Sequence, residues 1–346
     1  MRRNEYYAFQ GSCRGWIVVD ALETLQKKPL TRIESAETTR GRAWAIVLAG
    51  GEGVRLRALT RHLYGEDRPK QYAALFGSRS LLRQTLDRVA LAIPPERTVV
   101  VTLRSHARYI AAEFARSPFP RVLVQPENRG TAAGVLFPAH WIHWRDPEAI
   151  VAVFPSDHFI LEETMFMDHV AEVVTWVQRP EWIVLFGAQP TEPETEYGWI
   201  EPGEVLDWTA AGPICQVQRF REKPSAERAR DCLASGWLWN TLVFAAKVST
   251  LIEAGRQLLP QLHDRLARIA PFADTEDEAW AFQQAYHLAP RANFSQSILQ
   301  RCPPGLVVSR LPALTWCDWG TPERVFKSLT RARILPASFI GLELSA

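Results

Sequence analysis

The sequence is poor in cysteine and lacks the spacings that give cysteines a structural role. Its 346 residues include five cysteines, an odd number: Cys13, Cys215, Cys232, Cys302 and Cys317. No two of them form a CxxC pair, so neither a disulfide framework nor a zinc site is indicated. This usage favours a protein of the reducing cytoplasm.

The sequence also lacks long apolar runs and an excess of one sign of charge. No apolar run approaches the roughly 18 residues of a membrane helix, and the segment MRRNEYYAFQGSCRGW has no apolar core of a secretory signal. The 40 Lys and Arg residues nearly balance 38 Asp and Glu, and basic residues are not interleaved with the 13 tryptophans. A nucleic-acid binder would show a basic surplus or stripe. We therefore expect neither a nucleic-acid partner nor a membrane partner.

What is present is the composition of a globular protein, with 47% hydrophobic and 23% charged residues. Residues 1–42 differ from the rest, because they hold eight Lys/Arg against five Asp/Glu and show an apolar pattern only in WIVVDALETL. We interpret them as an N-terminal extension packed on the main domain, with a regulatory arm as the alternative. The main domain is expected over residues 43–330 and a C-terminal tail over residues 331–346.

From Trp44 onward, short apolar runs alternate with helical patterns. We predict strands over residues 43–49, 98–103, 121–125, 150–154, 182–187, 215–220 and 306–309. We predict helices over residues 80–92, 105–116, 131–144, 163–178, 225–235, 248–269 and 276–289. Near-continuous apolar strands suit a sheet that is buried on both faces. The alternation predicts an α/β, Rossmann-like layered domain with a mostly parallel mixed sheet flanked by helices.

The most unusual stretch is LAGGEGVRL (48–56), directly after the first predicted strand. Ligands bind at the carboxyl ends of strands in such sheets, and glycines let backbone N–H groups approach a phosphate. The dinucleotide fingerprint GxGxxG fails at Leu56, and the P-loop pattern fails too. A plain glycine turn is the alternative. However, Arg55 and the segment RPKQ (68–71) add the positive charge that a triphosphate requires.

The combination LAGGEGVRLRALT…RPKQ resembles the signature of sugar-phosphate nucleotidyltransferases, and it is most similar to that of mannose-1-phosphate guanylyltransferases. Other segments resemble this family in the same order along the chain: QPENRGTAAG (125–134), FPSDH (154–158), YGWIEPG (197–203), REKP (221–224), WLWNTLVF (237–244) and CDWGTPERV (317–325). Seven segments in order, between residues 44 and 325, are far more specific than one short motif. The resemblance implies the nucleotide-diphospho-sugar transferase type of fold.

Three positions depart from the family pattern. Arg57 stands at or next to a place where the family usually has tryptophan or proline. Gly130 replaces an asparagine, and Thr241-Leu242 replaces a Ser-Gly pair. These departures bear on the identity of the sugar more than on the class of reaction.

The resemblance implies a direct displacement, in which a sugar-1-phosphate oxygen attacks the α-phosphorus of a nucleoside triphosphate and pyrophosphate leaves. Such chemistry depends on positioning and charge neutralisation. Arg55 would hold the β- and γ-phosphates, Lys70 would contact the α-phosphate, and Lys223 would neutralise the sugar phosphate. Asp157 and Asp318 would hold Mg²⁺, for which hard oxygen ligands are suited.

The resemblance also implies binding residues for both substrates. Nucleotide binding is expected from Leu48, Gly50, Gly51, Gly53, Pro126, Asn128 and Thr131. Sugar-phosphate binding is expected from Gly198, Glu222, Lys223 and Asn240. His158, next to Asp157, is interpreted as structural.

The expected reaction is transfer of GMP from GTP to mannose-1-phosphate. The alternatives are another sugar-1-phosphate with UTP or dTTP, a non-catalytic homologue that senses nucleotide sugars, and a nicotinamide-dependent oxidoreductase, which the failed GxGxxG disfavours. The sequence leaves open whether the chain forms a homo-oligomer.

Overall fold

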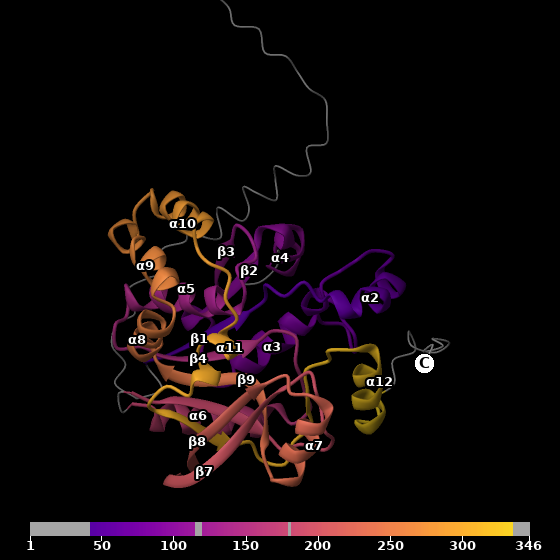
Figure 1. The fold of residues 1–346 in the computed structure, drawn as a ribbon. Helices are drawn as coiled ribbons and strands as arrows, with labels where there is room; N and C mark the ends of the chain where they lie inside the picture. Colours follow the sequence, from indigo (N-terminus) through magenta and orange to yellow (C-terminus); the bar gives the residue numbers. More distant parts are fainter. Residues whose placement is uncertain (1–41, 115–119, 179–180, 335–346) are drawn as a thin grey trace, which may run out of the picture.

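The computed structural model describes residues 42–114, 120–178 and 181–334, and Figure 1 shows their arrangement. Nearly all of the predicted N-terminal extension, with its segment WIVVDALETL, and most of the predicted C-terminal tail lie outside the described residues. Among the described residues, no helix combines the length and the apolar character that crossing a bilayer demands.

The centre of the described part is a nine-stranded mixed sheet. The spatial order of its strands is β3 (Arg121–Gln125), β2 (Thr98–Leu103), β1 (Ala43–Leu48), β4 (Ile150–Pro155), β9 (Leu238–Lys247), β6 (Ile183–Ala188), β10 (Leu306–Arg310), β8 (Gly212–Glu222) and β7 (Gly198–Thr209). The strands β3, β2, β1 and β4 run parallel, as do β6 and β10. Strand β9 is antiparallel to both β4 and β6, and β8 is antiparallel to both β10 and β7. The predicted α/β class with a mostly parallel mixed sheet is thus confirmed.

All seven predicted strands are present, but the sequence missed β7 and β9. Strand β7 contains glycine and proline in its GWIEPG segment, which weakens a strand pattern. In β9, Leu242 has a left-handed backbone with φ 56°. The strand pairs with β6 through a register shift at this place, and regular alternation is lost there.

Helices cover both faces of the sheet, as Figure 1 shows. The α-helices are α2 (Arg57–Tyr64), α3 (Leu81–Val89), α4 (Ala107–Phe114), α5 (Thr131–His143), α6 (Glu163–Trp176), α7 (Ala226–Ala234), α8 (Val248–Leu258), α9 (Pro260–Ala267), α10 (Glu278–His287), α11 (Phe294–Ser297) and α12 (Pro322–Arg331). The single helix predicted over 248–269 is wrong. It divides into α8 and α9, because Pro260 cannot continue a helix and instead begins the next one.

Two hydrophobic cores lie on opposite faces of the sheet, and strand β1 contributes side chains to both. Ala45 and Val47 belong to the core that α3, α4, α6 and α7 cover. Trp44 and Ile46 belong to the core under α5, α8, α9 and α10. A strand that is buried on both faces has to be apolar throughout, which is why β1 reads as a continuous apolar run. A third, smaller core joins α2 to α12, which lie side by side in Figure 1.

Two short strands lie outside the main sheet and join distant parts of the chain. Strand β5 (Phe159–Ile160) pairs antiparallel with β11 (Trp316–Cys317). Trp319 stacks on Phe159 with ring centroids 4.8 Å apart. This pairing brings the residues after β11 close to those after β4.

Gly130 is required by close packing at the start of α5. Its backbone has φ 85°, and a Cβ atom there would lie 2.2 Å from the carbonyl oxygen of Ala292. Two backbone hydrogen bonds hold Ala292 in place: its N–H donates to Arg129 O at 3.1 Å, and its carbonyl accepts from Ala132 N at 3.1 Å. Any side chain at position 130 would therefore have to displace this segment.

Replacing Gly130 by alanine should lower the free energy of unfolding by roughly 2–4 kcal/mol, because a backbone clash adds to left-handed strain. The matched control is Gly134→Ala in the same helix, where the new Cβ meets only Gln125 Oε1 at 3.9 Å. The control should be neutral or stabilising by up to about 1 kcal/mol. Denaturant unfolding measures both variants, and equal stabilities would contradict this account of Gly130.

Two histidines are buried without a compensating negative charge. Burial lowers the pKa of His169 to about 4, and its Nε2 lies 2.9 Å from Ser309 Oγ. Burial, with repulsion from His263 and His143, lowers the pKa of His140 to about 3. Unfolded histidines titrate near pH ~6.5. Between about pH 6.5 and 4 the unfolded chain therefore binds protons that the folded chain does not, and stability falls as the pH falls.

The variant His169→Gln should lose less stability than the wild type between pH 7 and 4.5, by roughly 1–3 kcal/mol, because one proton-binding difference is removed. Urea unfolding at several pH values measures how steeply the free energy of unfolding changes with pH, which is the slope compared between variants. The substitution His62→Gln at an exposed position of α2 is the control and should leave the slope unchanged. An unchanged slope in His169→Gln would contradict the prediction.

Candidate functional site

The glycine loop follows β1, and the side chain of Gln71 holds it through two hydrogen bonds. The amide of Gln71 donates to the carbonyl oxygens of Ala49 at 3.0 Å and Gly51 at 2.7 Å. Gly53 has φ 60°, and its Cβ position lies 2.9 Å from the backbone nitrogen of Lys70, whereas no atom lies within 4 Å of the Cβ position of Gly51. The loop therefore packs against the RPKQ segment at Gly53 and is open at Gly51. Gln71 belongs to the RPKQ segment, but the sequence pattern alone indicates no role for it.

The neighbouring strand ends are tied to this loop. Leu48 O accepts hydrogen bonds from Ser156 Oγ at 2.7 Å and from Ser156 N at 3.1 Å, which joins the ends of β1 and β4. The amide nitrogen of Gln125 lies 3.1 Å from the Cβ position of Gly50, which places the end of β3 against the loop.

Lys70 is the centre of the cluster, with an exposed fraction of only 9%. Its Nζ lies 3.1 Å from Asp157 Oδ2, and it donates to Asp318 O at 2.7 Å and Trp319 O at 3.3 Å. An ammonium group has three N–H donors, so these three contacts satisfy it. Lys70 thereby joins residues that follow β4 and β11, which the sequence had predicted to meet.

Asp318 is largely enclosed, with its side chain 16% exposed, but remains a carboxylate. Its Oδ1 accepts from Tyr197 OH at 2.8 Å, from Gly320 N at 2.9 Å and from Arg324 Nη1 at 3.0 Å. Burial acts to raise the pKa of Asp318, but the positive charges of Lys70 and Arg324 outweigh it and hold the pKa below its usual value. The cap of α12 is Thr321, so Asp318 is not needed there. Sequence reasoning assigned no role to Tyr197 or Arg324, although both lie in the quoted segments.

His158 is enclosed beside these carboxylates. Trp316 Nε1 donates to His158 Nδ1 at 3.3 Å, and the two rings meet edge to face. Burial lowers the pKa of His158 to about 4, against the opposing attraction of Asp157. A neutral ring that accepts from Trp316 agrees with a structural role.

The donor set around Lys70 suits a hard divalent cation that completes its shell with ligand oxygens. Within the described residues, no three His, Cys, Asp or Glu side chains gather closely enough to hold a metal alone. Asp157 and Asp318 offer two carboxylates, each compensated by a basic side chain. Mg²⁺ commonly binds one or two carboxylates, with phosphate oxygens and water as its other ligands. The residues present fit such an ion.

Arg55 and Lys223 meet at one carboxylate that sequence reasoning missed. Glu196 Oε2 lies 2.9 Å from Arg55 Nη1 and 3.3 Å from Lys223 Nζ. The three side chains are 42–49% exposed. Arg55 lies in the first motif and Lys223 in REKP, 168 positions later, so only the fold reveals that they share a partner.

The residues expected to bind the sugar phosphate lie on three adjacent strand segments. Gly198 pairs with Glu222 of β8 on one side and with Asn240 of β9 on the other. The Cβ position of Gly198 lies 2.8 Å from Phe220 Cζ, 2.9 Å from Glu222 Oε2 and 3.1 Å from Asn240 Cβ, so a side chain at this position would collide with its neighbours. Burial raises the pKa of Glu222, with Lys223 opposing the shift. Asn240 Oδ1 accepts from Leu242 N at 3.1 Å.

The side-chain oxygens of two residues expected to bind the nucleotide accept hydrogen bonds from backbone N–H groups. Asn128 Oδ1 accepts from Gly130 N at 2.9 Å, and Thr131 Oγ1 accepts from Phe294 N at 2.8 Å. The Asn128 bond lies within the segment that follows β3, next to the half-buried Pro126, and the Thr131 bond joins the start of α5 to the start of α11. The remaining polar group of the Asn128 side chain is its NH₂ donor.

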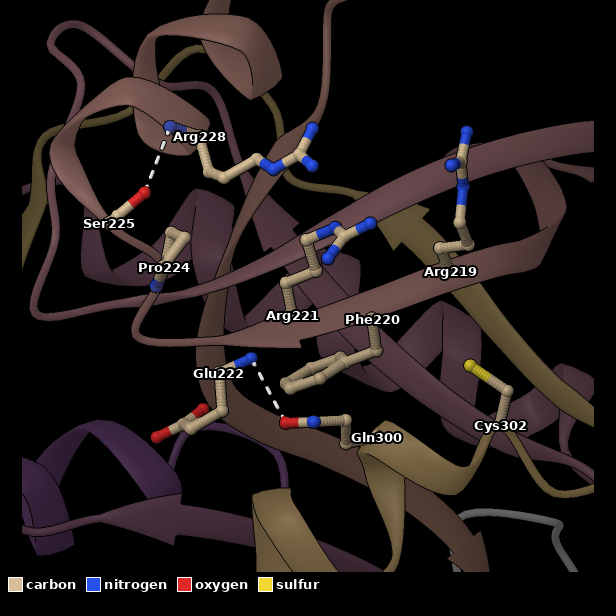
Figure 2. Close-up of a pocket in the computed structure, with 9 residues that line it drawn as sticks. All are labelled: Arg219, Phe220, Arg221, Glu222, Pro224, Ser225, Arg228, Gln300 and Cys302. Atoms are coloured by element: carbon tan, nitrogen blue, oxygen red, sulfur yellow. Dashed lines mark hydrogen bonds between the residues drawn. The ribbon is translucent and has the colours of Figure 1, made fainter.

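A cavity of about 420 Å³ is lined in part by Arg221, Glu222 and Pro224 of the REKP segment. Figure 2 shows the side chains of Arg219, Arg221 and Arg228 on one side of β8, whereas the Glu222 side chain points away from them. Arg219 is paired with Glu201, and Arg228 Nη1 lies 3.8 Å from Asp231 Oδ2. The arginines of this cavity are thus partly neutralised by surface carboxylates.

Comparison with known proteins places this architecture in a family. The model of the nucleotidyl transferase family matches residues 44–332. The chain is 28% identical over 289 residues to a mannose-1-phosphate guanylyltransferase of Escherichia coli K12, which covers 82% of this chain and 59% of that protein. It is 34% identical over 223 residues to the xanthan biosynthesis protein XanB of Xanthomonas campestris, which covers 63% of this chain and 45% of that protein. The chain thus spans about half the length of these curated relatives.

Solved structures agree with this assignment. A Thermus thermophilus protein named mannose-1-phosphate geranyltransferase is 31% identical, with a TM-score of 0.70 over 82% of this chain and 79% of that one. A Bacillus anthracis protein named as a glucose-1-phosphate thymidylyltransferase is 14% identical, with a TM-score of 0.51 over 85% and 96% of the two chains, and supports the fold alone.

The ion pair of Arg324 with Asp318 should contribute strongly to stability. Arg324 also binds Glu194 at 2.5 Å, and all three side chains are at most 16% exposed. Arg324→Gln should lower the free energy of unfolding by roughly 3 kcal/mol, because it leaves buried carboxylates without their cation. Lys327→Gln, which breaks an exposed pair with Glu192 on the same helix, should change it by less than about 1 kcal/mol. Similar losses in both variants, measured by denaturant unfolding, would contradict the assignment.

Proposed function

The chain belongs to the nucleotidyl transferase family, and from this premise we propose that it transfers a nucleoside monophosphate to a sugar-1-phosphate and releases pyrophosphate. The observation that carries the proposal is the convergence on Lys70. This buried ammonium joins the glycine loop, Asp157 after β4 and the segment Asp318–Trp319 after β11. A buried cation beside an open glycine loop is suited to a phosphate ligand.

In the proposed reaction an oxygen of the sugar phosphate attacks the α-phosphorus. A new P–O bond forms as the bond from the α-phosphorus to the oxygen that bridges the β-phosphate breaks, and pyrophosphate leaves with that oxygen. No covalent intermediate with the protein is needed, so the protein acts by positioning and by charge neutralisation. Lys70 packs against the loop at Gly53 and would contact the α-phosphate, where charge develops.

Arg55 and Lys223 have separate roles in this proposal. Arg55 would hold the β- and γ-phosphates and stabilise the departing pyrophosphate. Lys223 would neutralise the sugar phosphate, whose charge repels that of the nucleotide. Glu222 and Asn240, on either side of Gly198, would hydrogen-bond sugar hydroxyls, while the bare backbone of Gly198 would approach the sugar.

A magnesium ion is part of the proposal. Asp157 and Asp318 would hold it with one carboxylate each, since their donor chemistry fits this ion. When bound, Mg²⁺ supplies positive charge to phosphate oxygens. For Asp157 to serve as a ligand, Lys70 would transfer its ammonium from that carboxylate to the phosphate.

The proposed substrates are GTP and mannose-1-phosphate. This choice is supported by relatives named mannose-1-phosphate guanylyltransferase, at 27–28% identity over 80–88% of this chain. Pro126 and Asn128 would lie along the base, where a site that hydrogen-bonds one base rejects another that lacks the matching groups. Another sugar-1-phosphate with UTP or dTTP is the second candidate, because Leu242 and Gly130 depart from the motifs of the resembled family.

The test is pyrophosphate release with Mg²⁺, four nucleoside triphosphates and a panel of sugar-1-phosphates. We expect GTP with mannose-1-phosphate to react fastest, and Asp157→Asn to lower kcat by roughly 10²–10³-fold, since electrostatic groups of this kind contribute that much. Circular dichroism checks that the variant is folded.

The outcomes separate the alternatives. Equal rates with UTP or dTTP would overturn the choice of GTP and leave the reaction class intact. No pyrophosphate with any combination would favour a non-catalytic nucleotide-sugar sensor. Full activity of Asp157→Asn would refute its role at the metal.

A further inference from the structure

Glu196 occupies the position between two cations that are proposed to hold different substrates. One oxygen, Oε2, contacts both Arg55 Nη1 at 2.9 Å and Lys223 Nζ at 3.3 Å. A phosphate oxygen would make the same kind of contact with each cation. The carboxylate therefore stands where substrate anions have to arrive, if the proposed roles of Arg55 and Lys223 hold.

The backbone around Glu196 is held by its neighbours, whereas its side chain is half exposed. Tyr197 is held through its hydroxyl on Asp318 at 2.8 Å and through its carbonyl, which accepts from Lys223 N at 3.1 Å. On the other side, Glu194 is held by Arg324 at 2.5 Å. The Glu196 side chain is 42% exposed, so rotation into solvent can release both cations without moving the loop.

We propose that Glu196 is an internal anion that competes with both substrates and couples their binding. The inference rests on the proposed function. A single carboxylate neutralises Arg55 and Lys223 while the site is empty. A nucleotide phosphate carries more negative charge than one carboxylate, so it displaces Glu196 from Arg55 and repels it from the neighbourhood.

The coupling follows from the sharing of one oxygen. When the first anion displaces Glu196 from Arg55, Lys223 loses its internal partner as well. The second anion then meets a cation that is already free, so it binds more tightly than it would to the empty protein. A carboxylate that merely oriented the two cations would have the opposite effect, because its removal would weaken binding of both ligands.

The expected size is modest because the contacts are exposed. Solvent-exposed ion pairs contribute little individually, so two of them correspond to roughly a three- to tenfold change in affinity. The effect should shrink as ionic strength rises, since salt screens exposed pairs.

The experiment is calorimetric titration of the full chain with inorganic pyrophosphate and with mannose-1-phosphate, each alone and each in the presence of the other. In the wild type, pyrophosphate should tighten the binding of mannose-1-phosphate. In Glu196→Gln, each ligand alone should bind about three- to tenfold more tightly, and the tightening caused by the other ligand should fall by a similar factor. Glutamine keeps the size of the side chain and removes its charge.

The control is Glu192→Gln, which removes an equal charge from the same loop at the exposed pair with Lys327. It should leave the coupling between the two ligands unchanged. The control thus distinguishes the loss of the contact that Glu196 shares with Arg55 and Lys223 from a general rise in positive potential. Weaker binding in Glu196→Gln, or coupling equal to that of the wild type, would overturn the inference.

These titrations do not depend on turnover. If no nucleotide and sugar phosphate react while Glu196→Gln still binds pyrophosphate more tightly and loses coupling, the proposed reaction fails and the role of Glu196 as a competing anion stands. If turnover occurs and pyrophosphate binding is unchanged in the variant, the reaction stands and the inference fails.

Discussion

Cations that converge at one end of a sheet must be neutralised before any ligand arrives, and the site depends on this constraint. Removing charged groups from water costs several kcal/mol unless partners are supplied. Here each basic group has a carboxylate partner: Lys70 has Asp157, Arg324 has Asp318, and Arg55 and Lys223 share Glu196. The carboxylates that pair with Lys70 and Arg324 are largely buried. Glu196 and the two cations that it pairs with are half exposed. The largely buried pair of Arg324 with Asp318 is suited to holding the architecture. The half-exposed pairs of Glu196 are suited to exchanging a carboxylate for a ligand, as Lys70 would also do in the proposed reaction.

The fold supplies this arrangement by joining segments that are far apart in the sequence. The pairing of β5 with β11 brings the backbone carbonyl of Asp318 to Lys70. Tyr197 links the start of β7 to the carboxylate of Asp318. Strand β7 lies between β8 and β9 at Gly198, so that Glu222 and Asn240 face each other across a glycine. Because β7 leads directly from Glu196 into this strand pair, the shared carboxylate is positioned by the same element that forms the expected sugar site.

The sequence predicted those parts of the fold that depend on local pattern. Strands buried on both faces are apolar throughout, so β1, β2 and β4 were found with nearly correct bounds. Strand β9 was missed, because Leu242 adopts a left-handed backbone that interrupts its pattern. The motifs gave Arg55, Lys70 and Lys223, but no local pattern gives the contact of Glu196 with Arg55, which spans 141 positions. Likewise, the need for glycine at position 130 follows from Ala292, which lies far along the chain.

In the proposed mechanism, internal carboxylates hold the cations of the empty site and release them to phosphate. This exchange can be observed in a crystal structure of the chain with a nucleoside triphosphate and Mn²⁺, with the metal located by its anomalous scattering. We expect the metal at Asp157 and Asp318, with Lys70 Nζ moved from Asp157 to a phosphate oxygen and Arg55 moved from Glu196 to the terminal phosphates. A bound nucleotide with the contacts of Lys70 to Asp157 and of Arg55 to Glu196 unchanged would contradict this mechanism.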